Sequence, residues 1–351
     1  MKTLRSIVKD QINHISTDFV PYTLEFEYPI ARLLDDHYSK DWNKKLLQSV
    51  RLIGGVFDTW DTMVSMDPKD PTKFLDAYGS EWTRTGVISH VDSAALDKVE
   101  YSSYVFPDLG RFLQPQKMQR MFDESEACKN QYPVAHIGAG PFELGWRMMG
   151  IERMLESFIG EPDMISDLVE HLSALIMSFI DACAGLPVEA IMFGDDWCDQ
   201  RGCTIGLERW RTFYKPYYKH FISRIHQIGK KMILHVCGNV SPLIPDLIEI
   251  GLDVLETVQP EPEGMNPYHL KNEYGKDLTF WGGLGCQSIV TYGNPEQLTS
   301  EIRHLRAYMS QDGGYILAPS KPINHSVSLE NAIAIYETFI EENAKFNMAA
   351  G

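Results

Sequence analysis

The chain has 351 residues, of which 44% are hydrophobic and 23% charged, a composition typical of a globular protein. Its 48 acidic residues outnumber 32 basic ones, and the net charge of −16 repels phosphate groups, which argues against nucleic acids and membrane surfaces as partners. Six cysteines are too few for a disulfide scaffold in a chain of this length. The sequence shows neither a signal peptide nor an apolar run of about 18 residues. A reducing cytoplasm is therefore the expected location.

The first part of the chain, residues 1–110, has an irregular pattern. Helical spacing of apolar residues appears in 22–38 and again in 42–53. A polar, proline-containing section and a turn-rich segment follow. We therefore expect an α-rich N-terminal extension that caps one end of the fold.

From residue 130 to 345 the pattern becomes regular, because short apolar runs alternate with longer segments of helical spacing. The expected strands are 133–140, 190–196, 231–238, 253–258, 278–285 and 314–320. The expected helices are 164–185, 207–228, 296–310 and 329–344. This alternation predicts one α/β domain over 1–351, a (β/α)8 TIM barrel whose earlier strands lie in the irregular part. An open doubly wound sheet is the alternative, but no G-x-G-x-x-G follows an early strand.

Side chains capable of chemistry stand where several predicted strands end. They are Asp195 and Asp196, then His235 and Cys237, then Cys286. In α/β barrels the catalytic groups come from the carboxyl ends of the strands. This placement favours an enzyme, and we expect these five residues to open onto a common cavity.

His235 and Cys237 are one residue apart, so strand alternation places both side chains on one face. Imidazole and thiolate are good zinc ligands, but a zinc site needs at least a third one. Cys286 is the first candidate, and Glu256, a carboxylate within an apolar strand, is the second. The alternative is that both cysteines and the histidine are packed in the interior and that Glu256 pairs with a basic residue.

Asp195 and Asp196 form an adjacent carboxylate pair, in which one pKa is expected to be raised in a way that suits general acid–base catalysis. The alternative is that both cap the following loop and helix. The glycine-containing segment that ends at Glu143 resembles a loop that cradles a ligand, and Trp197 is a candidate wall for a flat substrate. A tryptophan is nevertheless more often part of the core.

Several segments in order resemble the uroporphyrinogen-decarboxylase-like superfamily: G-D-D-W-C-D-Q-R-G, I-L-H-V-C-G-N-V, V-Q-P, L-T-F-W-G-G-L-G-C-Q and G-G-Y-I-L-A-P-S. The resemblance covers about residues 130–345 and implies a barrel with its site at the carboxyl-terminal mouth. It also places Gln259, in V-Q-P, among the substrate-binding candidates. The arginine-rich R-Q-A-G-R segment of the decarboxylases has no counterpart in residues 1–60.

Within that superfamily the H-x-C pair is similar to that of cobalamin-linked methyltransferases, which act on thiols or on methyl ethers. The third zinc cysteine of the coenzyme M enzymes has no match, because the corresponding stretch reads A-P-S-K-P. The resemblance implies zinc-dependent methyl transfer between a small-molecule donor or acceptor and a corrinoid. No D-x-H-x-x-G motif is present, so the corrinoid is expected on a separate carrier protein. Tetrapyrrole decarboxylation and a non-catalytic barrel remain the alternatives, and a homodimer is the expected assembly.

Overall fold

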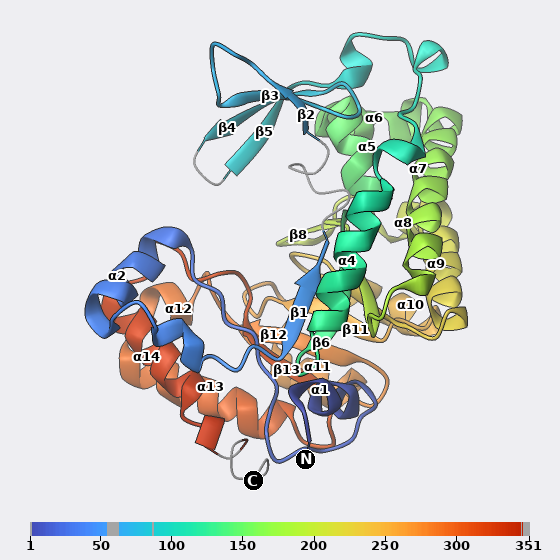
Figure 1. Cartoon of the computed structure of the whole chain (residues 1–351). Coiled ribbons are helices and arrows are strands. Elements are labelled where there is room, and N and C mark those ends of the chain that lie inside the picture. The colour runs from blue at the N-terminus through green and yellow to red at the C-terminus, as the bar shows by residue number, and fades with distance from the viewer. Residues whose placement is uncertain (1, 55–62, 86–87, 345, 347–351) are drawn as a thin grey trace.

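The structure, a computed structural model, describes residues 2–54, 63–85, 88–344 and 346. At its centre lies a curled parallel sheet of seven strands, which are neighbours in the sheet in the order of the chain (Figure 1). They are β1 (Val50–Ile53), β6 (Tyr132–Ala139), β7 (Ala190–Gly194), β10 (Lys231–His235), β11 (Val254–Val258), β12 (Thr279–Leu284) and β13 (Tyr315–Pro319). The six strands expected after residue 130 are thereby confirmed.

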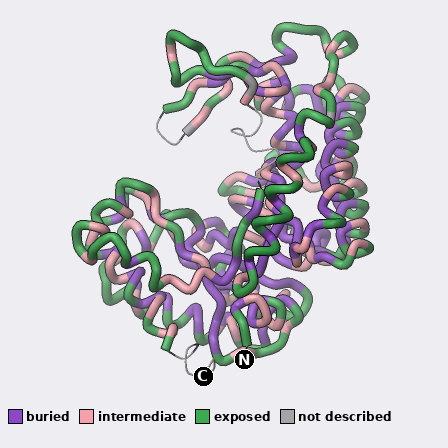
Figure 2. Tube along the Cα trace, viewed as in Figure 1, coloured by how far each residue is buried: buried purple, intermediate pink, exposed green. Residues whose placement is uncertain are grey.

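The sheet curls around its own apolar side chains. One buried cluster takes residues from all seven strands, among them Val50, Met192, Trp281 and Ile316. Helix α1 (Leu4–Ile12) adds Val8 and Ile12 to the same cluster. The larger cluster lies between the outer face of the sheet and the helices, and Figure 2 shows the buried residues along the middle of the molecule. The α/β class is therefore confirmed.

The predicted count of eight strands is not reproduced among the described residues. Strands β1 and β13 form the two edges of the sheet, and the backbone at Tyr22 bridges them with parallel pairings to Gln48 and Leu317. Thr23 N donates to Leu317 O at 3.0 Å, and Ser49 N donates to Tyr22 O at 2.9 Å. A short bridge thus occupies the place between the two edges where the barrel prediction requires a further strand.

The helices account for most of the remaining chain. After α1 they are α2 (Tyr28–Tyr38), α4 (Pro115–Ala127), α5 (Pro141–Met149), α6 (Ile151–Gly160), α7 (Pro162–Ala182), α8 (Leu207–Phe213), α9 (Lys215–Gln227), α10 (Ile244–Glu249), α11 (Pro267–Tyr274), α12 (Ile289–Tyr292), α13 (Pro295–Met309) and α14 (Leu329–Ile340). The single helix expected over 207–228 is divided into α8 and α9, because Pro216 in the first turn of α9 cannot donate a backbone hydrogen bond.

The expectation of an α-rich N-terminal part is wrong for residues 63–85 and 88–93. This stretch forms an antiparallel sheet of β2 (Met63–Met66), β3 (Lys73–Asp76), β4 (Glu81–Thr85) and β5 (Ile88–Ser93). In addition, β1 begins inside the segment expected to be helical over 42–53. These strands are short, so the alternation of their apolar and polar residues gives only a weak signal in the sequence.

The antiparallel sheet lies beyond the carboxyl ends of the central strands, at the top of Figure 1, and packs against helix α5. Ser80 Oγ donates to Arg147 O at 2.8 Å, and the rings of Trp82 and Trp146 lie 6.4 Å apart. The guanidinium of Arg147 lies 5.9 Å from both indole rings. Helix α5 therefore carries this sheet.

The segment Pro162–Gly185, which contains helix α7, is long and apolar enough to cross a membrane by length and composition alone. Half of it is buried within the fold, where Leu168, Val169 and Ile176 contribute to the large apolar cluster. A core helix of a globular protein has these same properties.

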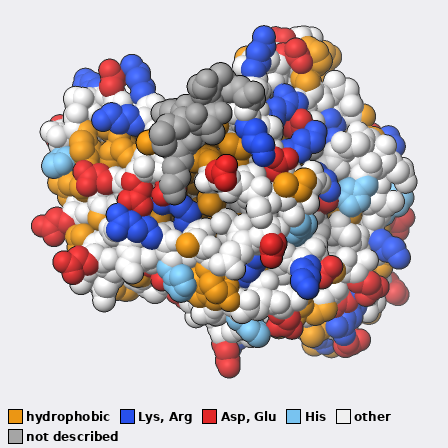
Figure 3. Space-filling view, turned by 90° about the horizontal axis from the view of Figure 1, so that it is seen from below, with side chains coloured by type: hydrophobic (Ala, Val, Ile, Leu, Met, Phe, Trp, Pro, Cys, Tyr) orange, Lys and Arg blue, Asp and Glu red, His pale blue; other side chains and the backbone are white. Residues whose placement is uncertain are grey.

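On the face seen in Figure 3, acidic and basic side chains are interspersed rather than segregated.

The bridging segment provides a test of the fold. Tyr22 is 1% exposed, and its hydroxyl accepts from Leu47 N at 2.8 Å and donates to Asn343 Oδ1 at 3.1 Å. Because Tyr22→Phe leaves both groups without this partner, we expect the free energy of unfolding to fall by about 1–3 kcal/mol. Urea denaturation should show a lower midpoint with an unchanged slope. Tyr292→Phe, at a tyrosine that is 83% exposed, is the control and should change little. Equal effects of the two substitutions would contradict the assignment.

Candidate metal centre

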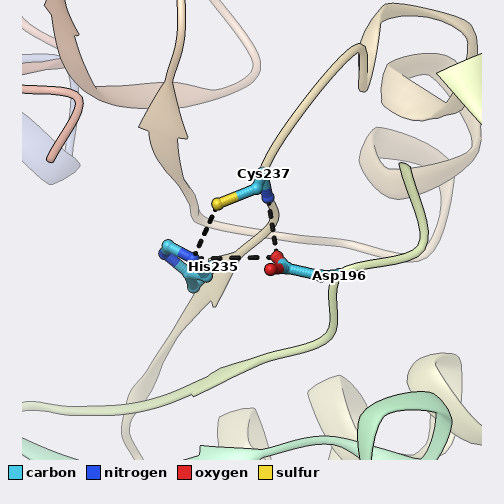
Figure 4. Close-up of side chains that lie close together, drawn as sticks. All are labelled: Asp196, His235 and Cys237. Carbon is cyan, nitrogen blue, oxygen red and sulfur yellow. Dashed lines mark hydrogen bonds and ion pairs between the residues drawn. The ribbon is translucent and has the colours of Figure 1, made fainter. Parts of the chain in front are cut away.

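Three potential metal ligands meet at the carboxyl ends of neighbouring strands. Asp196, His235 and Cys237 each offer one ligand atom, and these atoms all lie within 4.8 Å of one another (Figure 4). His235 ends β10, and Asp196 follows shortly after β7, which pairs with β10 in parallel. His235 Nε2 lies 3.3 Å from Cys237 Sγ and 3.7 Å from Asp196 Oδ1. The cluster combines a carboxylate, an imidazole and a thiol, each of which can bind a metal ion.

Glu256, on the adjacent strand β11, hydrogen-bonds the other ring nitrogen of His235, Nδ1. A carboxylate in this position accepts from Nδ1–H and so leaves Nε2 free to face Cys237 and Asp196. Burial by itself lowers the pKa of His235, but Glu256 and Cys237 raise it well above its ordinary value. The geometry makes Glu256 a partner that orients His235.

The turn after β10 is held in place by backbone contacts. Cys237 N donates to Asp196 Oδ1 at 2.9 Å, and Gly238 N donates to Gln259 Oε1 at 2.7 Å. Gly238 has a φ of +84°, and a Cβ there would lie 2.6 Å from Asp199 O, so only glycine fits. Gln259 is 2% exposed, and its side-chain carbonyl oxygen accepts the hydrogen bond from this turn. The structure thus gives Gln259 a contact that shapes the turn, and substrate binding by Gln259 stays a prediction.

Asp195 lies in the interior, whereas Asp196 faces outward with a 42% exposed side chain. The Asp195 carboxylate accepts from Phe142 N at 3.0 Å, Glu143 N at 2.7 Å, Trp197 Nε1 at 2.9 Å and Tyr218 OH at 2.8 Å. Burial raises the pKa of Asp195 to about 8, although these hydrogen bonds act in the opposite direction. Asp195 is wholly enclosed in this arrangement, and its catalytic role stays a prediction.

The two backbone donors to Asp195 belong to the first turn of helix α5, so Asp195 caps this helix from a neighbouring strand. Gly140, just before the helix, allows the approach, because a Cβ there would lie 2.7 Å from Asp195 Cγ. Glu143 in the same turn pairs with Arg147 at 2.8 Å, and burial raises the pKa of its carboxyl. The structure therefore ties Glu143 to its own helix.

Two further expected site residues lie away from the three clustered ligands. Trp197 is wholly buried and packs against Trp210 and Tyr218, which leaves it no surface for a ligand. Cys286 Sγ accepts from Lys321 N at 3.3 Å, and burial raises the pKa of the Cys286 thiol. Among the described residues, the group of three that can hold a metal contains Asp196 where the sequence suggested Cys286.

A cavity of about 650 Å³ opens beside the cluster. Its wall includes His235, Cys237 and Glu256, but Asp195, Asp196 and Cys286 do not line it, so the expected common cavity is shared by only part of the predicted set. The wall also contains Trp281 and residues that sequence reasoning missed: Thr23, Glu25, Gln48, Met192, Ser320 and Lys321. Ser320 and Lys321 follow directly after β13, so the rule about strand ends would have found them, whereas no strand pattern marks Thr23.

The region that carries this cluster matches a known family. The model of the uroporphyrinogen decarboxylase (URO-D) family matches residues 113–341. The chain belongs to this family. The URO-D match includes the whole sheet except β1, together with every residue of the three-ligand cluster.

A curated relative, the methylated-thiol–coenzyme M methyltransferase of Methanosarcina mazei, is 20% identical over 199 residues, which make up 57% of this chain and 50% of the relative. The chain thus spans about half the length of the curated relative it matches. Among solved structures, a methyltransferase from Methanosarcina mazei has a TM-score of 0.68 at 15% identity, covering 98% of this chain and 100% of that one. At this identity the likeness shows that the two proteins share a fold.

The position of Asp195 generates a prediction about stability. Asp195→Ala would leave four donors without an acceptor in the interior, and we expect the free energy of unfolding to fall by about 3 kcal/mol or more. Chemical denaturation measures the change. Asp36→Ala, at an exposed position on α2, is the matched control and should remain within about 0.5 kcal/mol of the wild type. If Asp195→Ala were as stable as Asp36→Ala, the capping role would be refuted.

Proposed function

We propose that this protein is a zinc-dependent methyltransferase that moves a methyl group between a corrinoid and a small thiol, methyl-ether or methylamine substrate. The observation that carries the proposal is the cluster of Asp196, His235 and Cys237 at the strand ends of a URO-D fold, beside a cavity. The methyltransferase relative supports the same chemistry. One barrel-like domain in the cytoplasm, acting as a homodimer, completes the proposal.

The donor atoms of the cluster fit zinc. Thiolate, imidazole and carboxylate are its ordinary protein ligands, and three of them leave one position of a tetrahedron open, as in catalytic sites. We therefore assign His235, Cys237 and Asp196 as the ligands, so that Asp196 takes the place first given to Cys286. Glu256 becomes a positioning residue, because its carboxylate already holds Nδ1 of His235. When bound, zinc supplies Lewis acidity, which stabilises a substrate thiolate or polarises a leaving heteroatom.

The cavity has room for a small molecule, since pockets for drug-sized ligands span about 300–1,000 Å³ and this one measures about 650 Å³. Met192 and Trp281 give it apolar walls, and Thr23, Glu25 and Lys321 add polar groups. A small substrate would bind with its reacting atom at the His235 and Cys237 side. The corrinoid would arrive on a separate carrier protein at the open mouth.

An assay of methyl transfer tests the function. We expect the purified protein to demethylate methylcobalamin in the presence of a small thiol such as coenzyme M, or to methylate cob(I)alamin from a methyl ether or methylamine. The change in corrinoid absorbance reports the reaction. Cys237→Ala should lower the rate at least a hundredfold, because it removes a ligand of the proposed metal, whereas Cys128→Ala should keep it. Efficient conversion of uroporphyrinogen to coproporphyrinogen, without methyl transfer, would instead establish the decarboxylase.

Metal analysis tests the ligand set. We expect the wild type to bind zinc stoichiometrically, Cys237→Ala to lose it, and Asp196→Ala to bind it more weakly. Glu256→Gln should keep the ligands and weaken binding about 10- to 100-fold through the orientation of His235. Cys286→Ala should bind zinc like the wild type.

Elemental analysis after dialysis, with circular dichroism to verify folding, gives the readout. Full zinc retention in Cys237→Ala would end the proposal of a zinc site. Loss in Cys286→Ala but not in Asp196→Ala would keep the site and return the third ligand to Cys286.

A further inference from the structure

A small hairpin follows Asp196 and brings two cysteines face to face. Strands β8 (Cys198–Asp199) and β9 (Gly202–Cys203) are antiparallel, with Cys198 directly opposite Cys203. The next pair outward is hydrogen-bonded, since Thr204 N donates to Trp197 O at 2.8 Å. Because the two kinds of pair alternate along an antiparallel ladder, the cysteines occupy the non-hydrogen-bonded site, where side chains on one face come closest.

The spacing at such a site suits a disulfide. Cα atoms of a non-hydrogen-bonded pair lie about 4.5 Å apart, and disulfides span about 4.4–6.8 Å. Both cysteines are free thiols. The neighbouring Cys198 thiol lowers the pKa of the Cys203 thiol. The pair is thus close enough to be linked without moving the backbone.

Other cysteines have different partners. Cys128 Sγ donates to Gln131 O at 3.6 Å, Cys237 contacts His235, and Cys286 contacts Lys321. Cys183 is wholly buried. The Cys198–Cys203 pair is therefore separate from the proposed zinc ligands, and its chemistry does not depend on them.

We propose that Cys198 and Cys203 form a site of reversible oxidation that exchanges with low-molecular-weight disulfides. Cys203 is partly exposed, whereas Cys198 is 8% exposed, so Cys203 reacts first with the small disulfide. The Cys203 sulfur displaces one thiol from the small disulfide and forms a mixed disulfide. The Cys198 sulfur then attacks Cys203 and releases the second thiol. Two electrons pass from the protein sulfurs to the small disulfide, and the two protons leave on its released thiols.

The hairpin touches the turn that carries Cys237, so oxidation of the hairpin thiols would occur in a segment that contacts this turn. Asn239 N donates to Asp199 O at 2.8 Å, and Gly238 packs against the carbonyl oxygens of Cys198 and Asp199. A disulfide would cross-link the two strands of the hairpin on which this turn rests. The inference concerns the thiol pair itself and holds whether or not the protein transfers methyl groups.

The sequence offers a direct test, because trypsin cleaves after Arg201, between the two cysteines. After incubation with glutathione disulfide, we expect the folded wild type to lose two hydrogens at this pair. The tryptic peptide 202–209 should then remain joined to the peptide that contains Cys198 until dithiothreitol is added. Non-reducing mass spectrometry with fragmentation distinguishes Cys198 from Cys183 in that peptide.

Serine variants identify the two roles. Cys198→Ser should accumulate glutathione on Cys203, since the second displacement is lost, and Cys203→Ser should form no link to peptide 202–209. Cys128→Ser is the control and should match the wild type. Circular dichroism verifies that each variant folds. A wild type in which Cys203 stays glutathionylated, or in which Cys198 and Cys203 remain reduced while other thiols react, would overturn the proposal.

Discussion

A buried carboxylate is tolerated only when its oxygens are hydrogen-bonded, and Asp195 meets this constraint with donors from three parts of the chain. Its backbone N–H donates to His235 O at 3.0 Å, so the same residue also ties the end of β7 to the end of β10. The first turn of α5, the core around Trp197 and Tyr218, and the position of the ligand cluster all depend on it. Asp195 therefore supports the site without lining it.

The adjacent residue, Asp196, faces the ligand cluster instead of the core, and this difference follows from strand alternation. Asp196 points outward from the strand end, next to His235 and Cys237, while Asp195 turns into the core. Glu256 then sets the orientation of the His235 ring from the next strand. The ends of three neighbouring strands of a parallel sheet thus supply these four groups, two of them from β10. Parallel βα units provide this arrangement because all their carboxyl ends face the same way.

Features that depend on residues close together in the sequence were predictable, whereas features that depend on contacts between distant segments were not. The strands after residue 130 were predictable because their apolar runs are local signals, and His235 and Cys237 were found because their spacing on one strand is local too. The third ligand was not predictable in the same way. Choosing between Asp196 and Cys286 requires the register of β7 against β10, which no local pattern encodes. Likewise, burial of Trp197 and the use of Gln259 in a turn arise from contacts between distant segments, and the short strands of 63–93 carry too weak a periodicity.

The bridge at Tyr22 joins the two edges of the central sheet through residues near opposite ends of the chain, Tyr22 and Leu317. A ribosome makes the Tyr22 segment first, but β13, with which it must pair, is synthesised after all the other strands of the central sheet. Helix α1 and the Tyr22 segment therefore have to wait unpaired while the strands between them are synthesised and assembled. Contacts of such long sequence separation form slowly. Joining of the sheet edges therefore follows the synthesis of β13, and the nascent chain exposes the open edge of β1 until β13 arrives.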